Sequence, residues 1–214
     1  MKVKIRQDVF EKALEKGTIA ALSDAAQTDT SNMSPLVKSA RITANSKALV
    51  IESSTDKISV KYTVTVKKDN GIVVEESGSG LVPAKELIGW VKAQGSDATI
   101  KMNLSKLSTP EIIDTVESLD SSDNKDFTIS KIGSLKLTSQ VASKTGRKWE
   151  LDVFEPGQRS KVDFKDKGEK HFDIQAKKFS ECLARIGFAS LKNDYEHVLD
   201  SVSIQAYKKN LYFF

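Results

Sequence analysis

An internal repeat is the feature of this 214-residue chain that most restricts its fold. Shifting the sequence by 169 positions brings Val3 onto Phe172 and superposes apolar residues at strand and helix spacing. The further matched pairs are Ile5 and Ile174, Phe10 and Phe179, Leu14 and Leu183, Lys16 and Arg185, Ile19 and Phe188, Ala20 and Ala189, and Leu22 and Leu191. Such self-similarity indicates that one structural unit occurs twice.

The repeat continues after a change of offset to 162. The pairs at this offset are Ser39 and Ser201, Ile42 and Ile204, Ala44 and Ala206, Lys47 and Lys209, and Leu49 and Leu211. The missing residues fall in a polar segment, where a change of loop length costs little free energy. The same order of strand, helix, loop, strand and strand is therefore expected in both copies.

The period of the apolar residues predicts the elements of the first copy. Period two indicates strands and period three to four indicates helices. The expected strands are 2–6, Leu36–Thr43, Ala48–Ser53, Ile58–Val66, Ile72–Val74, Thr99–Leu104, Phe127–Ile132, Leu135–Val141 and Trp149–Val153, and the expected helices are residues 7–22 and 84–94. Asp69-Asn70-Gly71 indicates a hairpin turn, because Asn-Gly favours positive backbone angles.

Residues 105–126 read as an insertion on a strand connection. Ser108-Thr-Pro-Glu111 is typical of a helix start, and the polar run ending at Lys125 is typical of a flexible tip. We expect a first domain over residues 1–165, a charged linker over 161–170, and a second domain begun at 170 and cut short at 214. The chain is therefore expected to be a piece of a longer protein, of α+β class, with helices packed on one face of antiparallel sheets.

The motifs and the composition of the sequence bear on which classes of function are expected. No Gly-rich phosphate loop, nucleophile elbow or HExxH motif occurs, and His171 and His197 lack neighbours at metal-ligand spacing, so we expect neither an enzyme nor a metal or other cofactor. The single cysteine, Cys182, and a charged N-terminus without a signal peptide indicate a cytoplasmic protein. The net charge of +4 is too mild to identify a nucleic-acid binder by itself.

Four segments in order resemble the bacterial DNA polymerase sliding clamp, the β subunit of DNA polymerase III. They are Ser34-Pro-Leu-Val37, the run from Leu49 to Lys57, Val82-Pro-Ala-Lys-Glu-Leu87, and Gly146-Arg-Lys-Trp149. The resemblance implies the DNA clamp fold, in which two subunits of three domains close head to tail into a ring around double-stranded DNA. Partners implied for a full-length protein are the polymerase and the clamp loader, whereas this chain alone is expected to be a monomer.

The resemblance implies that helices line the hole and attract phosphates without reading bases. Candidate DNA-binding residues are Lys12, Lys16, Lys85, Lys92, Lys177, Lys178 and Arg185 on the helices, with Arg147 and Lys148 as further candidates. The alternative for each is an ordinary solvated charge, because Glu11, Glu15 and Glu181 occupy the same helices.

Ring closure in the family uses the last strand and second helix of the first domain. By position this implies Trp149, Leu151 and Glu86 at the subunit interface. A core position for Trp149 is the alternative, and Trp90 competes for the anchoring role. Most of the family's peptide-binding pocket lies beyond this chain.

A non-enzymatic β-rich protein, such as a phage structural component or a peptide-binding module, is the rival interpretation. It would account for the strands and the mild charge. It gives no reason for a repeated strand-helix unit with a basic helix in each copy.

Overall fold

The computed structural model describes residues 1–27, 34–55, 58–116, 127–142, 144–155, 174–186, 204–207 and 210–213. The chain divides into two compact units, unit 1 (Met1–Asp163) and unit 2 (Phe164–Phe214). The elements of unit 1 are β1 (Lys2–Arg6), α1 (Gln7–Gly17), α2 (Asp24–Gln27), α3 (Ser34–Val37), β2 (Ser39–Ala44), β3 (Ala48–Ser54), β4 (Ser59–Thr65), η1 (Lys68–Asn70), β5 (Val73–Glu76), β6 (Gly78–Pro83), α4 (Ala84–Lys92), β7 (Thr99–Val116), β8 (Phe127–Val141) and β9 (Lys144–Phe154). Those of unit 2 are α5 (Ala176–Ile186), β10 (Ile204–Tyr207) and β11 (Asn210–Phe213).

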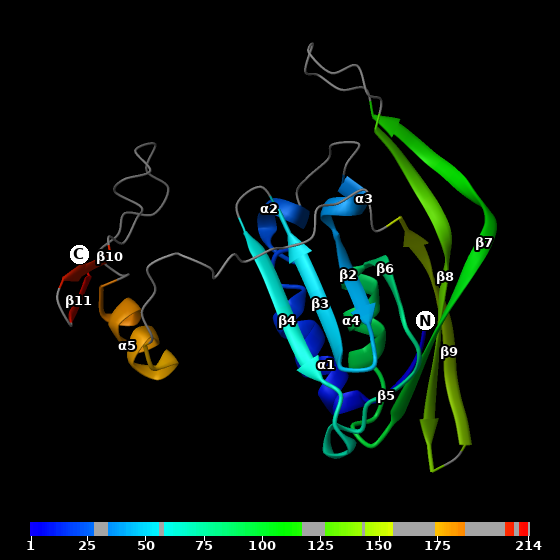
Figure 1. Ribbon diagram of the computed structural model, residues 1–214, viewed down its shortest axis with the longest axis horizontal. Coiled ribbons are helices and arrows are strands. Elements are labelled where there is room, and N and C mark those ends of the chain that lie inside the picture. Colours follow the sequence, from blue (N-terminus) through cyan, green and yellow to red (C-terminus); the bar gives the residue numbers. More distant parts are fainter. Residues whose placement is uncertain are drawn as a thin grey trace. The chain divides into compact units, whose positions relative to one another are not determined.

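The described strands of unit 1 form one antiparallel sheet in the order β4-β3-β2-β6-β9-β8-β7-β1-β5. Its two halves meet between β6 and β9, where the register pairs only Leu81 with Phe154. Figure 1 shows the β2–β3–β4 group and the β7–β8–β9 group on two sides of α1 and α4. The sheet therefore folds around the two long helices of the unit.

The core of unit 1 lies between the helices and the inner face of both half-sheets. Phe10 and Leu14 of α1 are fully buried, as is Leu87 of α4, and they share one cluster with Leu135 and Leu137 of β8. Helix α1 approaches β3 closely, because a Cβ at Gly17 would lie 2.6 Å from Cβ of Ile51. Burial of this apolar face is what holds the short helices in place.

The turn at residues 69–71 forms, but the hairpin expected there is wrong. Gly71 adopts a φ of 60°, as an Asn-Gly turn requires. Strands β4 and β5 nevertheless lie at opposite edges of the sheet, and β5 pairs with β1. The turn is a local feature, whereas the choice of pairing partner depends on the whole core.

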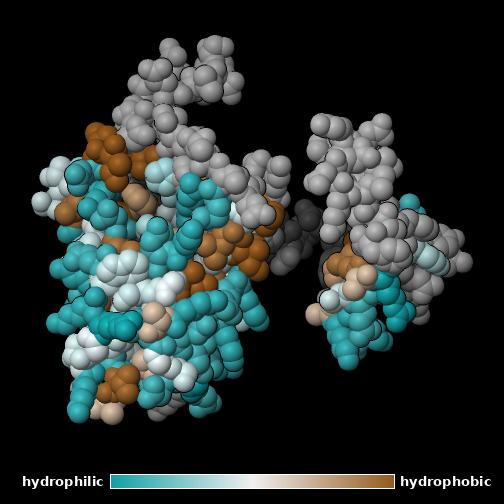
Figure 2. All heavy atoms as spheres, turned by 180° about the vertical axis from the view of Figure 1, so that it is seen from behind, coloured by the Kyte–Doolittle hydropathy of each residue, from teal (hydrophilic) through white to brown (hydrophobic). Residues whose placement is uncertain are grey.

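The helix start expected at Ser108–Glu111 is also wrong, since β7 continues as a strand through Val116 and pairs with β8. The register shifts between Lys106 and Glu111, so Pro110 occupies a bulge. A residue in a bulge is not needed as a hydrogen-bond donor to the neighbouring strand, so proline is tolerated there. Leu107, Ile112 and Ile113 are exposed here, and Figure 2 shows hydrophobic surface at this end of the unit. The expected tip at 121–125 lies outside the described residues.

Unit 2 repeats the beginning of unit 1. The offset of 169 carries α1 (Gln7–Gly17) onto α5 (Ala176–Ile186) with the same bounds. The offset of 162 carries the facing pair of Ala44 and Leu49 onto that of Ala206 and Leu211. The strand expected at Phe172–Ile174 and the linker at 161–170 fall wholly or mainly outside the described residues.

Candidate functional site

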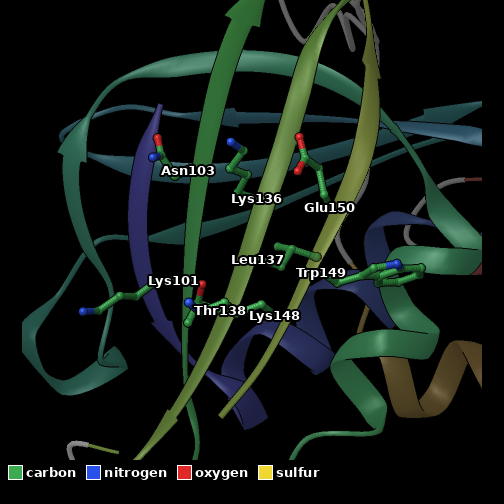
Figure 3. A pocket seen from close by; sticks show the side chains of 8 residues that line it. All are labelled: Lys101, Asn103, Lys136, Leu137, Thr138, Lys148, Trp149 and Glu150. Carbon is green, nitrogen blue, oxygen red and sulfur yellow. The ribbon is translucent and has the colours of Figure 1, made fainter. Parts of the chain in front are cut away.

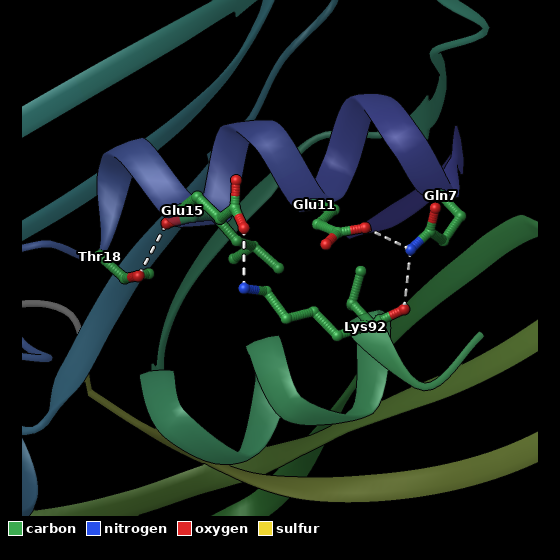
Figure 4. A network of polar contacts seen from close by, with 7 residues as sticks. Gln7, Glu11, Glu15, Thr18 and Lys92 are labelled. Carbon is green, nitrogen blue, oxygen red and sulfur yellow. Dashed lines mark hydrogen bonds and ion pairs between the residues drawn. The ribbon is translucent and has the colours of Figure 1, made fainter. Parts of the chain in front are cut away.

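Helices α1 and α4 lie side by side and are joined by polar contacts (Figure 4). The buried amide of Gln7 donates to Oε2 of Glu11 at 2.7 Å and to the carbonyl oxygen of Val91 at 3.1 Å. Nζ of Lys92 lies 2.7 Å from Oε1 of Glu15. The two helices therefore form one surface, here called the helix pair.

Three of the predicted DNA-binding lysines lie exposed on the helix pair: Lys12, Lys16 and Lys85. No ion pair involves them among the residues that the structure describes. Lys16 extends over Tyr62 of β4, with Nζ 5.2 Å from the ring centroid, a contact that holds an ammonium without neutralising it. These three lysines are available to an anion.

Lys92 differs from the other three lysines because Glu15 neutralises it. Its hydrogen bond to Glu15, and then the charge of the same carboxylate, raise the pKa of Lys92. With Asp8, Glu11 and Glu86 also on these helices, the helix pair carries as many acidic as basic side chains. Attraction of an anion to the helix pair would therefore depend on the three lysines without an ion pair and not on net charge.

Lys177, Lys178 and Arg185 lie exposed on α5 of unit 2, with Glu181 as the acidic residue of that helix. Arg185 occupies the position equivalent to Lys16 in the repeat. This helix therefore has a basic surplus that the helix pair of unit 1 lacks.

On strand β9, Trp149 and Leu151 pair with the core residues Leu137 and Leu135 and so lie on the inner face of the sheet, whereas Lys148 lies on the outer face. Trp149 is 37% exposed, whereas Leu151 is 6% exposed and packs in the core. Lys148 faces Thr138 and Lys101 across the strands, on the face opposite to the core. The structure therefore does not bring Lys148 together with the helix lysines, and it does not expose Leu151 for contact with a partner.

The edge of β9 beside Trp149 is open. From Lys144 to Val153 the described residues of this strand pair only with β8, since the pairing with β6 joins Phe154 to Leu81. Ser139 Oγ accepts the backbone N–H of Arg147 at 3.0 Å and fixes the irregular register there. An exposed tryptophan beside unpaired backbone groups is suited to strand-to-strand association.

Glu86, the third residue predicted at the subunit interface, is exposed on α4.

The described residues contain no cluster of histidine, cysteine or acidic side chains that could hold a metal ion. His171 and His197 lie outside them. No helix within the described ranges is both long and apolar enough to cross a bilayer.

Sequence reasoning missed a second basic surface on the outer sheet face, formed by Lys101, Lys136 and Lys148. The period of two in Thr99–Leu104 and Leu135–Val141 places Lys101 and Lys136 on the face opposite to the core. It gives no register between the strands, and register is what brings the three lysines together.

No protein-family model and no curated protein matches the sequence. The fold does match solved structures. The β subunit of DNA polymerase from Streptococcus pyogenes superposes with a TM-score of 0.66 at 17% identity, over 95% of this chain and 43% of that one. A DnaN sliding clamp (DNA polymerase III subunit beta) from Bartonella birtlesii bound to griselimycin gives 0.67 and 16%, over 100% and 45%.

The DNA polymerase III subunit beta from Pseudomonas aeruginosa gives a TM-score of 0.64 at 16% identity, over 95% of this chain and 43% of that one. The chain therefore has the fold of the sliding clamps, mixed helix and antiparallel sheet, as the sequence predicts. It spans less than half the length of these structures.

Proposed function

We propose that this chain is the N-terminal part of a divergent DNA sliding clamp, which encloses double-stranded DNA and tethers a polymerase without performing chemistry. The observation that carries the proposal is the match of at least 95% of the chain to β subunits of DNA polymerase. In this proposal residues 1–165 form the first clamp domain, with residues 105–126 as its insertion, and 170–214 begin the second.

In this proposal each unit carries its own DNA-facing residues, on the helix pair in unit 1 and on α5 in unit 2. Enclosing a duplex requires only diffuse attraction to phosphates, which leaves the protein free to slide. Lys12, Lys16 and Lys85 support this role because they are exposed and unpaired in the described structure. Lys177, Lys178 and Arg185 extend the same role to unit 2, and Lys92 contributes once Glu15 releases it.

The open edge of β9 is the proposed site of ring closure. Trp149 would anchor a second subunit there, with Glu86 at the rim and Leu151 supporting Trp149 from the core. The full-length protein then forms a homodimeric ring, and this chain alone is a monomer. The clamp loader and the polymerase are the further partners, bound mainly by parts of the protein beyond this chain.

Topological trapping tests the proposed function. The protein that contains this chain would be loaded on nicked circular DNA and washed in salt high enough to screen phosphate contacts. We expect it to remain on the circle and to leave as soon as a restriction enzyme linearises the DNA. Equal loss from circular and linear DNA would contradict enclosure.

A further inference from the structure

Two cross-strand rows on the outer face of the sheet half formed by β1, β7, β8 and β9 hold five lysines. The pairing registers place Lys4, Lys101 and Lys148 in one cross-strand row with Thr138. Lys2 and Lys136 stand in the next row, together with Asn103 and Glu150. Core residues occupy the alternate positions, so this face lies on the other side of the sheet from the helix pair.

The five lysines differ in whether an acid neutralises them. Lys2 pairs with Glu76 and Lys4 pairs with Glu75. Both glutamates belong to β5, the strand at the edge of the sheet. Lys101, Lys136 and Lys148 have no ion pair among the described residues. The lysines without an ion pair therefore lie on β7, β8 and β9, and the charge of Lys101 also helps to lower the pKa of Glu75, after the hydrogen bond and charge of Lys4.

These three lysines surround a hollow of about 730 Å³, here called the lysine groove (Figure 3). Asn103 and Thr138 add hydrogen-bonding side chains, and Glu150 is the only acid among the described residues of its lining. Glu150 also acts on Lys131: the hydrogen bond from Lys131 to Asp152 is the main cause that raises the pKa of Lys131, and the charge of Glu150 adds to it. The lining has a formal net charge of +2.

We propose that the lysine groove binds an extended acidic peptide segment of a partner protein. In an extended peptide, side chains on one face recur about every 7 Å, and neighbouring strands of the sheet lie about 4.8 Å apart. Carboxylates at alternate positions of a peptide crossing β7, β8 and β9 can thus meet successive lysines, while Asn103 and Thr138 bond its polar groups.

Peptide is favoured over single-stranded nucleic acid by the absence of a stacking platform. Nucleic-acid grooves combine basic residues with aromatic faces on which bases stack. Of the described residues that line the groove, Trp149 alone is aromatic, and its side chain extends away from the lysines (Figure 3). Because the groove and the helix pair lie on opposite faces, the acidic segment would not compete with DNA at the helix pair.

Fluorescence anisotropy on this chain tests the proposal. The probe is a labelled peptide of about ten residues in which Asp or Glu alternates with Ser, which is long enough to cross all three strands. The groove variant combines K101E, K136E and K148E. The control variant combines K47E, K67E and K106E, which makes the same change of net charge at exposed lysines outside the groove. Circular dichroism checks that both variants fold.

We expect the groove variant to weaken peptide binding by about tenfold or more and the control variant to change it by less than about twofold, since exposed charges act over roughly a Debye length. Absence of peptide binding to the unchanged chain, or equal losses in both variants, would overturn the proposal. So would an oligothymidine of equal charge that displaces the peptide from the groove.

Discussion

Nζ of Lys92 on α4 lies 2.7 Å from Oε1 of Glu15 on α1, so an ion pair bridges the two helices on the surface that we propose to face DNA. A phosphate that approaches Lys92 must therefore compete with a carboxylate already in place. In the proposed function, Glu15 would thus limit the attraction of the helix pair for DNA.

Replacing Glu15 by Gln is expected to strengthen duplex binding. The change removes a negative charge and releases Lys92, which should raise the affinity for duplex DNA by about threefold at low salt. Titration of a labelled duplex measures it. E75Q is the matched control, since it breaks the Lys4 pair on the opposite sheet face and should leave duplex affinity unchanged. Equal gains in both variants would count against the helix pair.

The same ion pair predicts a pH dependence of stability. Because Glu15 raises the pKa of Lys92 above 10.5, the pair stabilises the folded chain below that pH, and its contribution is lost as pH rises through the raised value. The difference in free energy of unfolding between wild type and E15Q should therefore shrink at high pH, as measured by urea unfolding. The exposed Glu86 gives the control: the corresponding difference for E86Q should not follow this pattern.

Removing Lys12, Lys16 and Lys85 together should weaken duplex binding and flatten its salt dependence. Replacing all three by Ala is expected to lower the slope of log affinity against log salt by about 2 to 3, since each phosphate contact contributes about 0.9. K2A combined with K4A and K101A removes as many lysines from the outer face and should leave the slope nearly unchanged. A slope that is the same in both variants and the wild type would exclude the helix lysines.

Gly133 and Gly89 should respond oppositely to replacement by Ala. A Cβ at Gly133 would lie 2.0 Å from the carbonyl oxygen of Ser105, so G133A forces β7 and β8 apart and should cost about 2 kcal/mol or more. A Cβ at Gly89 of α4 meets nothing within 4 Å, so G89A should stabilise the chain by about 0.5 to 1 kcal/mol. Chemical unfolding measures both, and a destabilised G89A would contradict this packing.

Replacing Trp149 and replacing Trp90 should have different effects, because we propose Trp149 for the subunit interface whereas Trp90 packs against the core. Trp149 is 37% exposed at an open edge, whereas Trp90 is partly buried and packs against the core. W149A should therefore cost this chain less than about 1 kcal/mol but should dissociate the longer protein's dimer, while W90A should destabilise the chain itself. Unfolding and light scattering measure the two effects. A dimer that survives W149A would contradict the proposed closure.

Local patterns predicted the elements whose signals are local. The period of Phe10 and Leu14 located α1, although the helix ends at Gly17, where the chain must pass close to Ile51. Strand β6 escaped prediction because Gly78-Ser-Gly80 has low strand propensity. Glycine is nevertheless required at Gly80, since a Cβ there would lie 2.6 Å from Cγ1 of Val153.

The candidate site was predictable to the extent that it lies on single helices. Helical spacing placed Lys12 and Lys16 away from the core. The Lys92 and Glu15 pair joins two helices far apart in sequence, and the lysine groove joins three strands, so both depend on tertiary packing. The roles of the site residues stay predictions.

The paired hairpins of the two units bear on the origin of the chain. Ala44 faces Leu49 and Ala206 faces Leu211, although the repeats differ in length between helix and hairpin. A register kept across copies with mostly different side chains is what duplication of one ancestral coding segment would leave, with a later insertion or deletion between the helix and the hairpin. Equivalent positions of the two units could then be compared residue by residue.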